Sequence, residues 1–159
     1  MNRRHLLSLL ALAPITVPLA AHAQSSAQPE LPKEKLTITT RDGKTHNFNI
    51  EMALTSDQQT VGLMHRPSVP EDGGMLFDWG APRESSMWMK NTISSLDMVF
   101  INQDGTIRAI AERTIPHSLA NISSRGPVRA TLELAAGTTE RLNIRVGDQI
   151  RQRILGNVP

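Results

Sequence analysis

Alternating apolar and polar side chains predict β-strands along most of this chain. Residues 36–40 and residues 48–52 both alternate with a period of two, as expected for strands with one buried face. Between them lies the segment 41–44, which contains an Asp-Gly pair. Such a pair between two alternating segments is typical of a tight turn, so the sequence predicts a β-hairpin here.

A second hairpin follows the same pattern further along the chain. The segment 96–102, which is mostly apolar, runs into the turn 103–105, and residues 106–113 return with apolar side chains on one face. Three more strands are predicted from apolar or alternating segments, at residues 128–134, 141–146 and 150–155.

One short helix is predicted between the first hairpin and the second. Thr55 or Ser56 can cap it, with Gln58 or Gln59 completing a capping box, and it should end before Pro67. Segments rich in proline, glycine and serine are expected to be loops, at 66–74, 80–85 and 114–127. The predicted fold is therefore mainly β, a small antiparallel β-sandwich or barrel-like domain with one short helix.

The first 23 residues have the pattern of an export signal. Arg3 and Arg4 precede an apolar run at residues 6–21, and Ala21-His22-Ala23 matches an A-x-A cleavage site. The run is too short for a typical spanning helix and is interrupted by two prolines. We therefore expect a cleaved signal peptide, no membrane anchor after cleavage, and a periplasmic or secreted protein. Residues 2–7 also resemble a twin-arginine signal, so the export route stays open.

The remainder divides into a flexible tether at 24–35 and one β domain at 36–155. Without the signal, 15 basic side chains balance 15 acidic ones, because two of the 17 basic residues belong to the signal. A neutral domain without a long basic run is a poor nucleic-acid binder. We expect a monomer whose partner is a small polar ligand or another protein of the cell envelope.

Composition and motifs exclude several classes of enzyme. The chain has no cysteine, which excludes disulfide scaffolds, thiol enzymes and cysteine zinc sites. It also has no glycine-rich phosphate loop, no nucleophile-elbow serine and no His-Glu-x-x-His motif. No cofactor is expected.

Five motifs follow one another in a fixed order along the chain: Gly62–Arg66, Gly74–Phe77, Met87–Thr92, Leu96–Phe100 and Leu132–Gly137. Their order and spacing are similar to those of the bacterial and archaeal family called domain of unknown function 192. The resemblance covers about residues 36–155 and implies a small all-β domain that is often exported. It implies no established activity.

The motif at 87–92 supplies the first candidate binding residues. Residues 87–90 are expected to form a strand, which places Trp88 and Lys90 on one face and the two methionines on the other. Trp88 would fill the core or form a pocket wall. Asn91 and Lys90 would lie at the strand end, where binding loops are common.

Two carboxylates lie between apolar neighbours and need partners if they are buried. Asp97 and Glu133 are both flanked by apolar residues in predicted strands. An isolated buried carboxylate would be neutralised, so Arg66 or Lys90 is expected to pair with one of them. With Trp88 and Asn91, these four charged residues form the predicted ligand-binding site.

Two other functions remain open from the sequence. Asp97 and Glu133 together could act as the acid and base of an envelope glycan hydrolase. Met87, Met89 and His65 offer the soft ligands that suit copper(I) in a periplasmic protein. The main expectation is a binding or accessory module without catalysis and without a bound metal.

Overall fold

The computed structural model describes residues 26–158 and shows one seven-stranded sheet that curls into a nearly closed barrel. The predicted signal peptide at 1–23 lies outside the described residues. The strands are β1 (Lys33–Thr39), β2 (Thr45–Ala53), β3 (Met75–Met87), β4 (Leu96–Ile101), β5 (Ile107–Ala111), β6 (Ile122–Ala135) and β7 (Gln149–Arg151). Two short helices, α1 (Ser56–Val61) and α2 (Thr138–Arg141), and a 3-10 turn at Arg153–Leu155 complete the fold.

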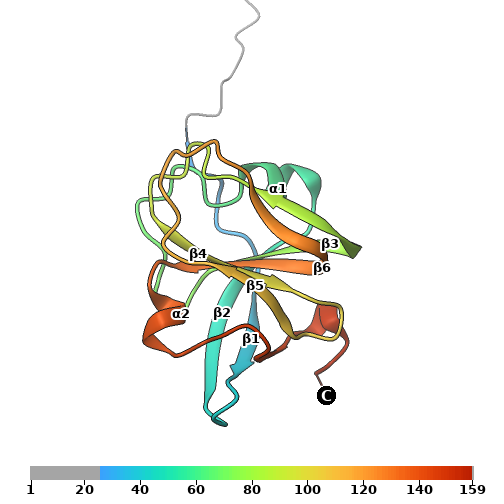
Figure 1. The fold of residues 1–159 in the computed structure, drawn as a ribbon. Coiled ribbons are helices and arrows are strands. Elements are labelled where there is room, and N and C mark those ends of the chain that lie inside the picture. The colour runs from blue at the N-terminus through green and yellow to red at the C-terminus, as the bar shows by residue number, and fades with distance from the viewer. Residues whose placement is uncertain (1–25, 159) are drawn as a thin grey trace, which may run out of the picture.

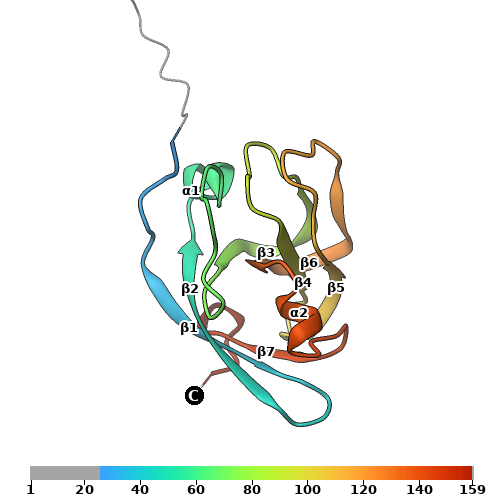
Figure 2. The same cartoon turned by 90° about the vertical axis from the view of Figure 1, so that its left-hand side faces the viewer.

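The strand order is β5-β4-β6-β3-β2-β1-β7, and the two outermost strands approach each other. A single bridge joins Thr106, just before β5, to Gln149 of β7. The amide of Ile107 also donates to the carbonyl of Asp148. These contacts leave little open edge, so the mainly β barrel-like fold is confirmed. Figures 1 and 2 show α1 at one end of the molecule and the β1–β2 turn at the opposite end.

Both predicted hairpins are present in the structure. β1 pairs with β2, and β4 pairs with β5, each antiparallel. Gly43 and Gly105 have positive φ in the two turns, which glycine tolerates without strain. The sheet is mixed rather than purely antiparallel, because β2 runs parallel to β3 over three residue pairs.

The predicted helix is confirmed with its cap. The Thr55 hydroxyl accepts from the amide of Gln58, and the Gln58 side chain accepts from the amide of Thr55. This reciprocal pair is the capping box expected from the sequence. The Gln59 side chain then donates to the carbonyls of Ala53 and Asp78, which ties α1 to β2 and β3.

Several predicted boundaries were wrong. Residues 80–85 were expected to be a loop, yet they continue β3 through an irregular pairing between Asp78 and Arg83. β6 already begins at Ile122, inside another predicted loop. β3 ends at Met87, so residues 88–90 are not a strand. In each case the long β3–β6 pairing determines the boundary, and it joins segments that are distant in sequence.

The strand predicted at 141–146 is absent. Gly137, with φ of 82°, begins α2, and Asn143 adopts positive φ in the turn that follows. The amide of Ile144 donates to the carbonyl of Thr139, and Ile144 is fully buried. Ile144 is therefore apolar because it is buried within a turn, and not because it belongs to a strand with one buried face.

The segment expected to be a tether contacts the barrel over most of its described length. Gln28 donates to the carbonyls of Gln58 and Gly62, and the amide of Leu31 donates to Glu51. Residues 33–35 belong to β1. No helix among residues 26–158 is long and apolar enough to cross a membrane.

Two hydrophobic clusters lie on opposite faces of the central strands. The first fills the barrel and includes Ile38, Ile50, Val99 and Leu132. The second covers the outer face of β3, β4 and β6 and contains Phe77 and Met98, among others. The outer cluster is incomplete at one place, where a cleft opens between α1 and the second half of β3.

Candidate functional site

The floor of this cleft is formed by Glu133 of β6 and Phe77 of β3. Glu133 pairs in register with Met75 on β3 and with Met98 on β4. Directly opposed residues on paired strands point to the same face, so Glu133 lies on the outer face with these two buried methionines. The cleft above it has a volume of about 380 Å³, within the range of about 300–1,000 Å³ typical of small-molecule sites.

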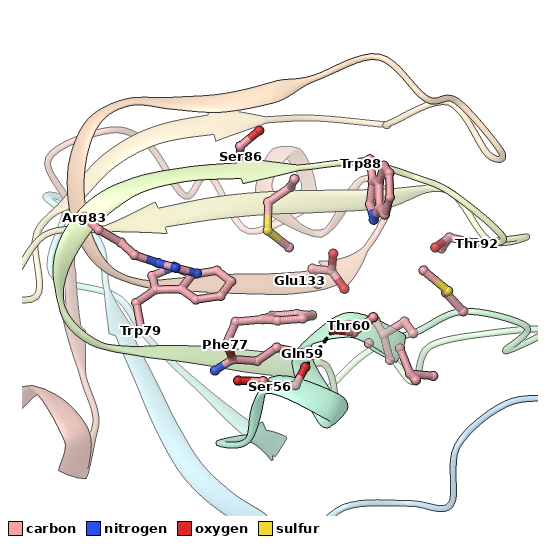
Figure 3. A pocket seen from close by; sticks show the side chains of 15 residues that line it. Ser56, Gln59, Thr60, Phe77, Trp79, Arg83, Ser86, Trp88, Thr92 and Glu133 are labelled. Atoms are coloured by element: carbon pink, nitrogen blue, oxygen red, sulfur yellow. Dashed lines mark hydrogen bonds between the residues drawn. The ribbon is translucent and has the colours of Figure 1, made fainter. Parts of the chain in front are cut away.

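Aromatic side chains form much of the cleft wall. Phe77 and Trp79 stack with ring centroids 5.8 Å apart. The indole N–H of Trp79 donates to the Thr131 hydroxyl, which fixes the ring orientation. Trp88 follows the end of β3 and is 47% exposed. Figure 3 shows the Glu133 carboxyl between Trp88 and Phe77.

The helix side of the cleft adds polar groups to these walls. Ser56, Gln59 and Thr60 project from α1, and Ser86 and Thr92 lie on the other side. The segment that follows α1 supplies apolar lining, ending at Met64. The cleft therefore combines flat apolar walls with hydroxyl and amide groups at its edges.

Two cations of the chain itself stack on the cleft tryptophans. The guanidinium carbon of Arg83 lies 4.3 Å from the Trp79 ring centroid, and Lys90 Nζ lies 5.1 Å from that of Trp88. Both distances are within the range of cation–π attraction. Among the residues lining the cleft, Arg83 and Glu133 are the charged side chains.

Glu133 is the unusual group of the site. It is 4% exposed, and no residue within 26–158 donates a hydrogen bond or forms an ion pair with its carboxyl group. Burial raises the pKa of Glu133 to about 8, because the charged form loses hydration. At neutral pH the group is therefore mostly a neutral acid that can both donate and accept a hydrogen bond.

The predicted site residues separate into two groups. Trp88 and Glu133 line the cleft, and Lys90 stacks on the exposed tryptophan. Asn91 lies in the turn beyond, with φ of 55°, and its carbonyl accepts from the amide of His65. Arg66 and Asp97 are not part of the cleft lining.

The predicted pairing of Arg66 or Lys90 with Asp97 or Glu133 was wrong. Arg66 instead forms a bidentate pair with Glu51, at 2.6 and 2.8 Å. Both side chains are largely buried. Glu51 lies on β2, at a position that belongs to the polar half of the strand alternation. The sequence pattern therefore predicts an exposed side chain there, not a buried charge.

Asp97 is held by donors at the end of the barrel. Its carboxylate accepts from the amides of Arg113, Gly137 and Thr139 and from the Thr139 hydroxyl, at 2.9–3.1 Å. Asp97 pairs in register with Leu134, whereas Glu133 pairs with Met98. The two carboxylates therefore point to opposite faces of the sheet. The hydrolase hypothesis needs both in one cleft, and this arrangement contradicts that requirement.

The three side chains of the copper hypothesis have different surroundings in the structure. Met89 is fully buried in the outer cluster, where its sulfur accepts from the Thr114 hydroxyl. Met87 lines the cleft, whereas Met89 and His65 do not. The two methionines do not share a strand face, because the strand ends at the first of them. Within the described part of the chain, no cluster of three His, Asp or Glu side chains could hold a metal ion.

The sequence reasoning missed Phe77, Trp79 and Arg83. Phe77 and Trp79 are two residues apart in a segment followed by Gly80, and strand alternation places both side chains on one face. That spacing could have identified one wall of the cleft. No pattern in the sequence indicates that Arg83 lines the cleft. The irregular pairing of β3 between Asp78 and Arg83 determines its position.

Comparisons with known proteins now add to this geometry. The model of the family DUF192, described as "Uncharacterized ACR", matches residues 37–152. This chain belongs to the DUF192 family. The family expected from the five motifs is thereby confirmed, and it comes without an established activity. None of the curated proteins matches the chain.

Two crystal structures are similar to this DUF192 protein. One is from Sinorhizobium meliloti 1021 and is described as a candidate transcription regulator. It is 45% identical, with a TM-score of 0.77, over 80% of this chain and 99% of that chain. The other, a protein of unknown function from Novosphingobium aromaticivorans, is 32% identical with a TM-score of 0.74, over 89% and 94% of the two chains.

Proposed function

We propose that this DUF192 protein binds a small organic ligand in the cleft above Glu133 and carries out no chemistry on it. The observation that supports binding is the carboxyl of Glu133, which is buried, lacks a described partner and faces an open cleft. Buried polar groups are nearly always hydrogen-bonded, so a ligand that supplies the missing partner would be stabilised there.

A binding role fits the cleft better than a catalytic role. General acid–base or nucleophilic catalysis usually needs two cooperating groups within hydrogen-bond distance. The residues lining the cleft include one carboxyl and no histidine. Glu133 is the one lining group that could act as a base, and the hydroxyls of Thr60, Ser86 and Thr92 donate to other acceptors instead.

Intrinsic fluorescence provides a direct test of ligand binding. The chain contains two tryptophans and no tyrosine, and both tryptophans line the cleft. Ligands from a library of small polar and aromatic metabolites should change the emission intensity or wavelength and raise the melting temperature. Glu133→Gln should weaken the binding of these hits, whereas Glu71→Gln, at an exposed position outside the cleft, should leave it unchanged. A library without a single hit would reject the proposed function.

We also propose that the protein acts in the periplasm or outside the cell. The pattern of residues 1–23 supports export, as described above. Fractionation of the native host followed by N-terminal sequencing should find a protein that begins at Gln24 outside the cytoplasm. Full-length protein confined to the cytoplasm would reject this part of the proposal.

A further inference from the structure

The surroundings of Glu133 indicate which kind of ligand the cleft takes. Three aromatic side chains and one buried carboxyl face the same space: Phe77, Trp79, Trp88 and Glu133. An aromatic ring attracts cations to its face, and a carboxylate pairs with them. In this structure both tryptophans already hold a cation of the chain, Arg83 or Lys90.

We propose that the ligand is an organic cation, a protonated amine whose nitrogen pairs with Glu133 and whose apolar body lies against the aromatic walls. This inference rests on the proposed function and adds the class of ligand. The primary ammonium group can donate hydrogen bonds to both the carboxylate and the nearby hydroxyls. Its apolar body would cover part of the exposed Trp88.

The distribution of charge in the cleft favours a cation over an anion. Glu133 lies at the floor, where it is 4% exposed and the low dielectric strengthens charge interactions. An anionic ligand that entered to this depth would meet a group that can become negative. Arg83 offers a positive charge, but it is exposed at the edge and stacked on Trp79.

Binding of such a cation should displace a proton from Glu133. With a pKa of about 8, the group is mostly protonated at pH 7. An adjacent ammonium favours the carboxylate, so the acid proton passes to water as the ion pair forms. The other charged groups around the cleft are two basic side chains, Arg83 on β3 and Lys90 beside Trp88. The residues lining the cleft from α1 and from 62–64 are uncharged.

The experiment uses three probes of nearly equal shape and different charge. These are 2-phenylethylammonium, 2-phenylethanol and phenylacetate, titrated into the full domain and followed by tryptophan fluorescence. We expect the cation to bind at least about tenfold more tightly than the neutral alcohol, a difference of about 1.4 kcal/mol. Calorimetry in buffers of different ionisation enthalpy should show close to one proton released at pH 7 and almost none at pH 9, where Glu133 is mostly ionised and the amine is still mostly protonated.

Variants connect this preference to the named residues. Glu133→Gln should abolish both the preference for the cation and the proton release, and Glu71→Gln should retain both. Trp88→Ala removes a half-exposed wall and should weaken binding of the cation without abolishing proton release. Because Trp88 is exposed, Trp88→Ala tests the site even if Glu133→Gln folds poorly.

The outcomes separate the ligand class from the binding function. If the alcohol or phenylacetate binds as tightly as the cation, or if Glu133→Gln keeps the preference, the organic-cation inference is overturned and the binding function stands. The inference is also overturned if no probe binds while the metabolite library yields other ligands. If neither the probes nor the library bind, both proposals fall.

Discussion

Arg66 and Glu51 form a bidentate ion pair that joins the segment after α1 to β2. The two hydrogen bonds measure 2.6 and 2.8 Å, and Glu51 also accepts from the amide of Leu31. Ser94 donates to the carbonyl of Arg66, which adds the loop before β4 to the same junction. The junction around this pair therefore connects four segments that are separate in the sequence.

Replacing Glu51 alone should destabilise the fold more than replacing Glu51 and Arg66 together. Glu51→Ala leaves a guanidinium largely buried without its carboxylate, which should lower the free energy of unfolding by about 3–5 kcal/mol. The double variant Glu51→Met/Arg66→Met should lose less than this single variant, because no charge stays buried. Urea denaturation measures the free energy of unfolding of the single and the double variant. Equal losses in the single and double variants would contradict a buried, mutually compensating pair.

Asp97→Ala should destabilise the barrel end where α2 packs. The substitution removes the acceptor of three backbone amides and one hydroxyl. Donors left without a partner cost about 1–3 kcal/mol each when they stay buried, so a total loss of about 4 kcal/mol is expected. Asp104→Ala is the control, because Asp104 accepts within its own exposed turn. A loss below about 1 kcal/mol for Asp97→Ala would contradict this role.

Stability should fall between pH 4.5 and pH 8 because of Glu133. Burial raises the pKa of this group from 4.5 to about 8, so the folded protein binds its proton more tightly than the unfolded chain. The contribution to stability is complete below pH 4.5 and is lost as the pH rises through 8. It amounts to at most about 5 kcal/mol. The free energies of unfolding of Glu133→Gln and of the unaltered protein should agree below pH 4.5, diverge progressively between pH 4.5 and pH 8, and differ by a constant amount above pH 8, with the variant more stable.

The same titration should be visible in the spectrum of the folded protein. Ionisation of Glu133 changes the field at the two cleft tryptophans, so emission should shift with a midpoint near pH 8. Glu133→Gln should remove this transition. A midpoint that persists in the variant would assign the titration to another group.

Gly74→Ala should disrupt the pairing of β3 with β6. A Cβ atom at this position would lie 2.3 Å from the backbone carbonyl oxygen of Glu133, and φ at Gly74 is 156°. Neither backbone segment can move freely, because the carbonyl of Gly74 also accepts from the amide of Glu51. We expect a loss of at least about 3 kcal/mol and altered ligand binding. Gly43→Ala, with positive φ but open space around the position, should cost about 1 kcal/mol.

Local features of the sequence identified much of the fold. The hairpins at 36–52 and 96–113 and the capping box of Thr55 depend on residues close together in the chain, so periodicity and turn residues were sufficient. Periodicity predicted the wrong structure for residues 141–146. There the alternation of apolar and polar residues belongs to a turn after α2 and not to a strand. Periodicity also could not locate the start of β6 at Ile122, which depends on the second half of β3.

The sequence by itself determined a β-rich domain of the DUF192 family and directed attention to Trp88 and Glu133. Only the tertiary structure decided that Arg66 pairs with Glu51 and that the Asp97 carboxylate accepts hydrogen bonds from backbone amides. The reason is the strand register: a shift of one residue reverses the face on which a side chain lies, and register arises from contacts across the whole barrel. Those contacts leave Glu133 without a partner among residues 26–158, at the floor of an aromatic cleft.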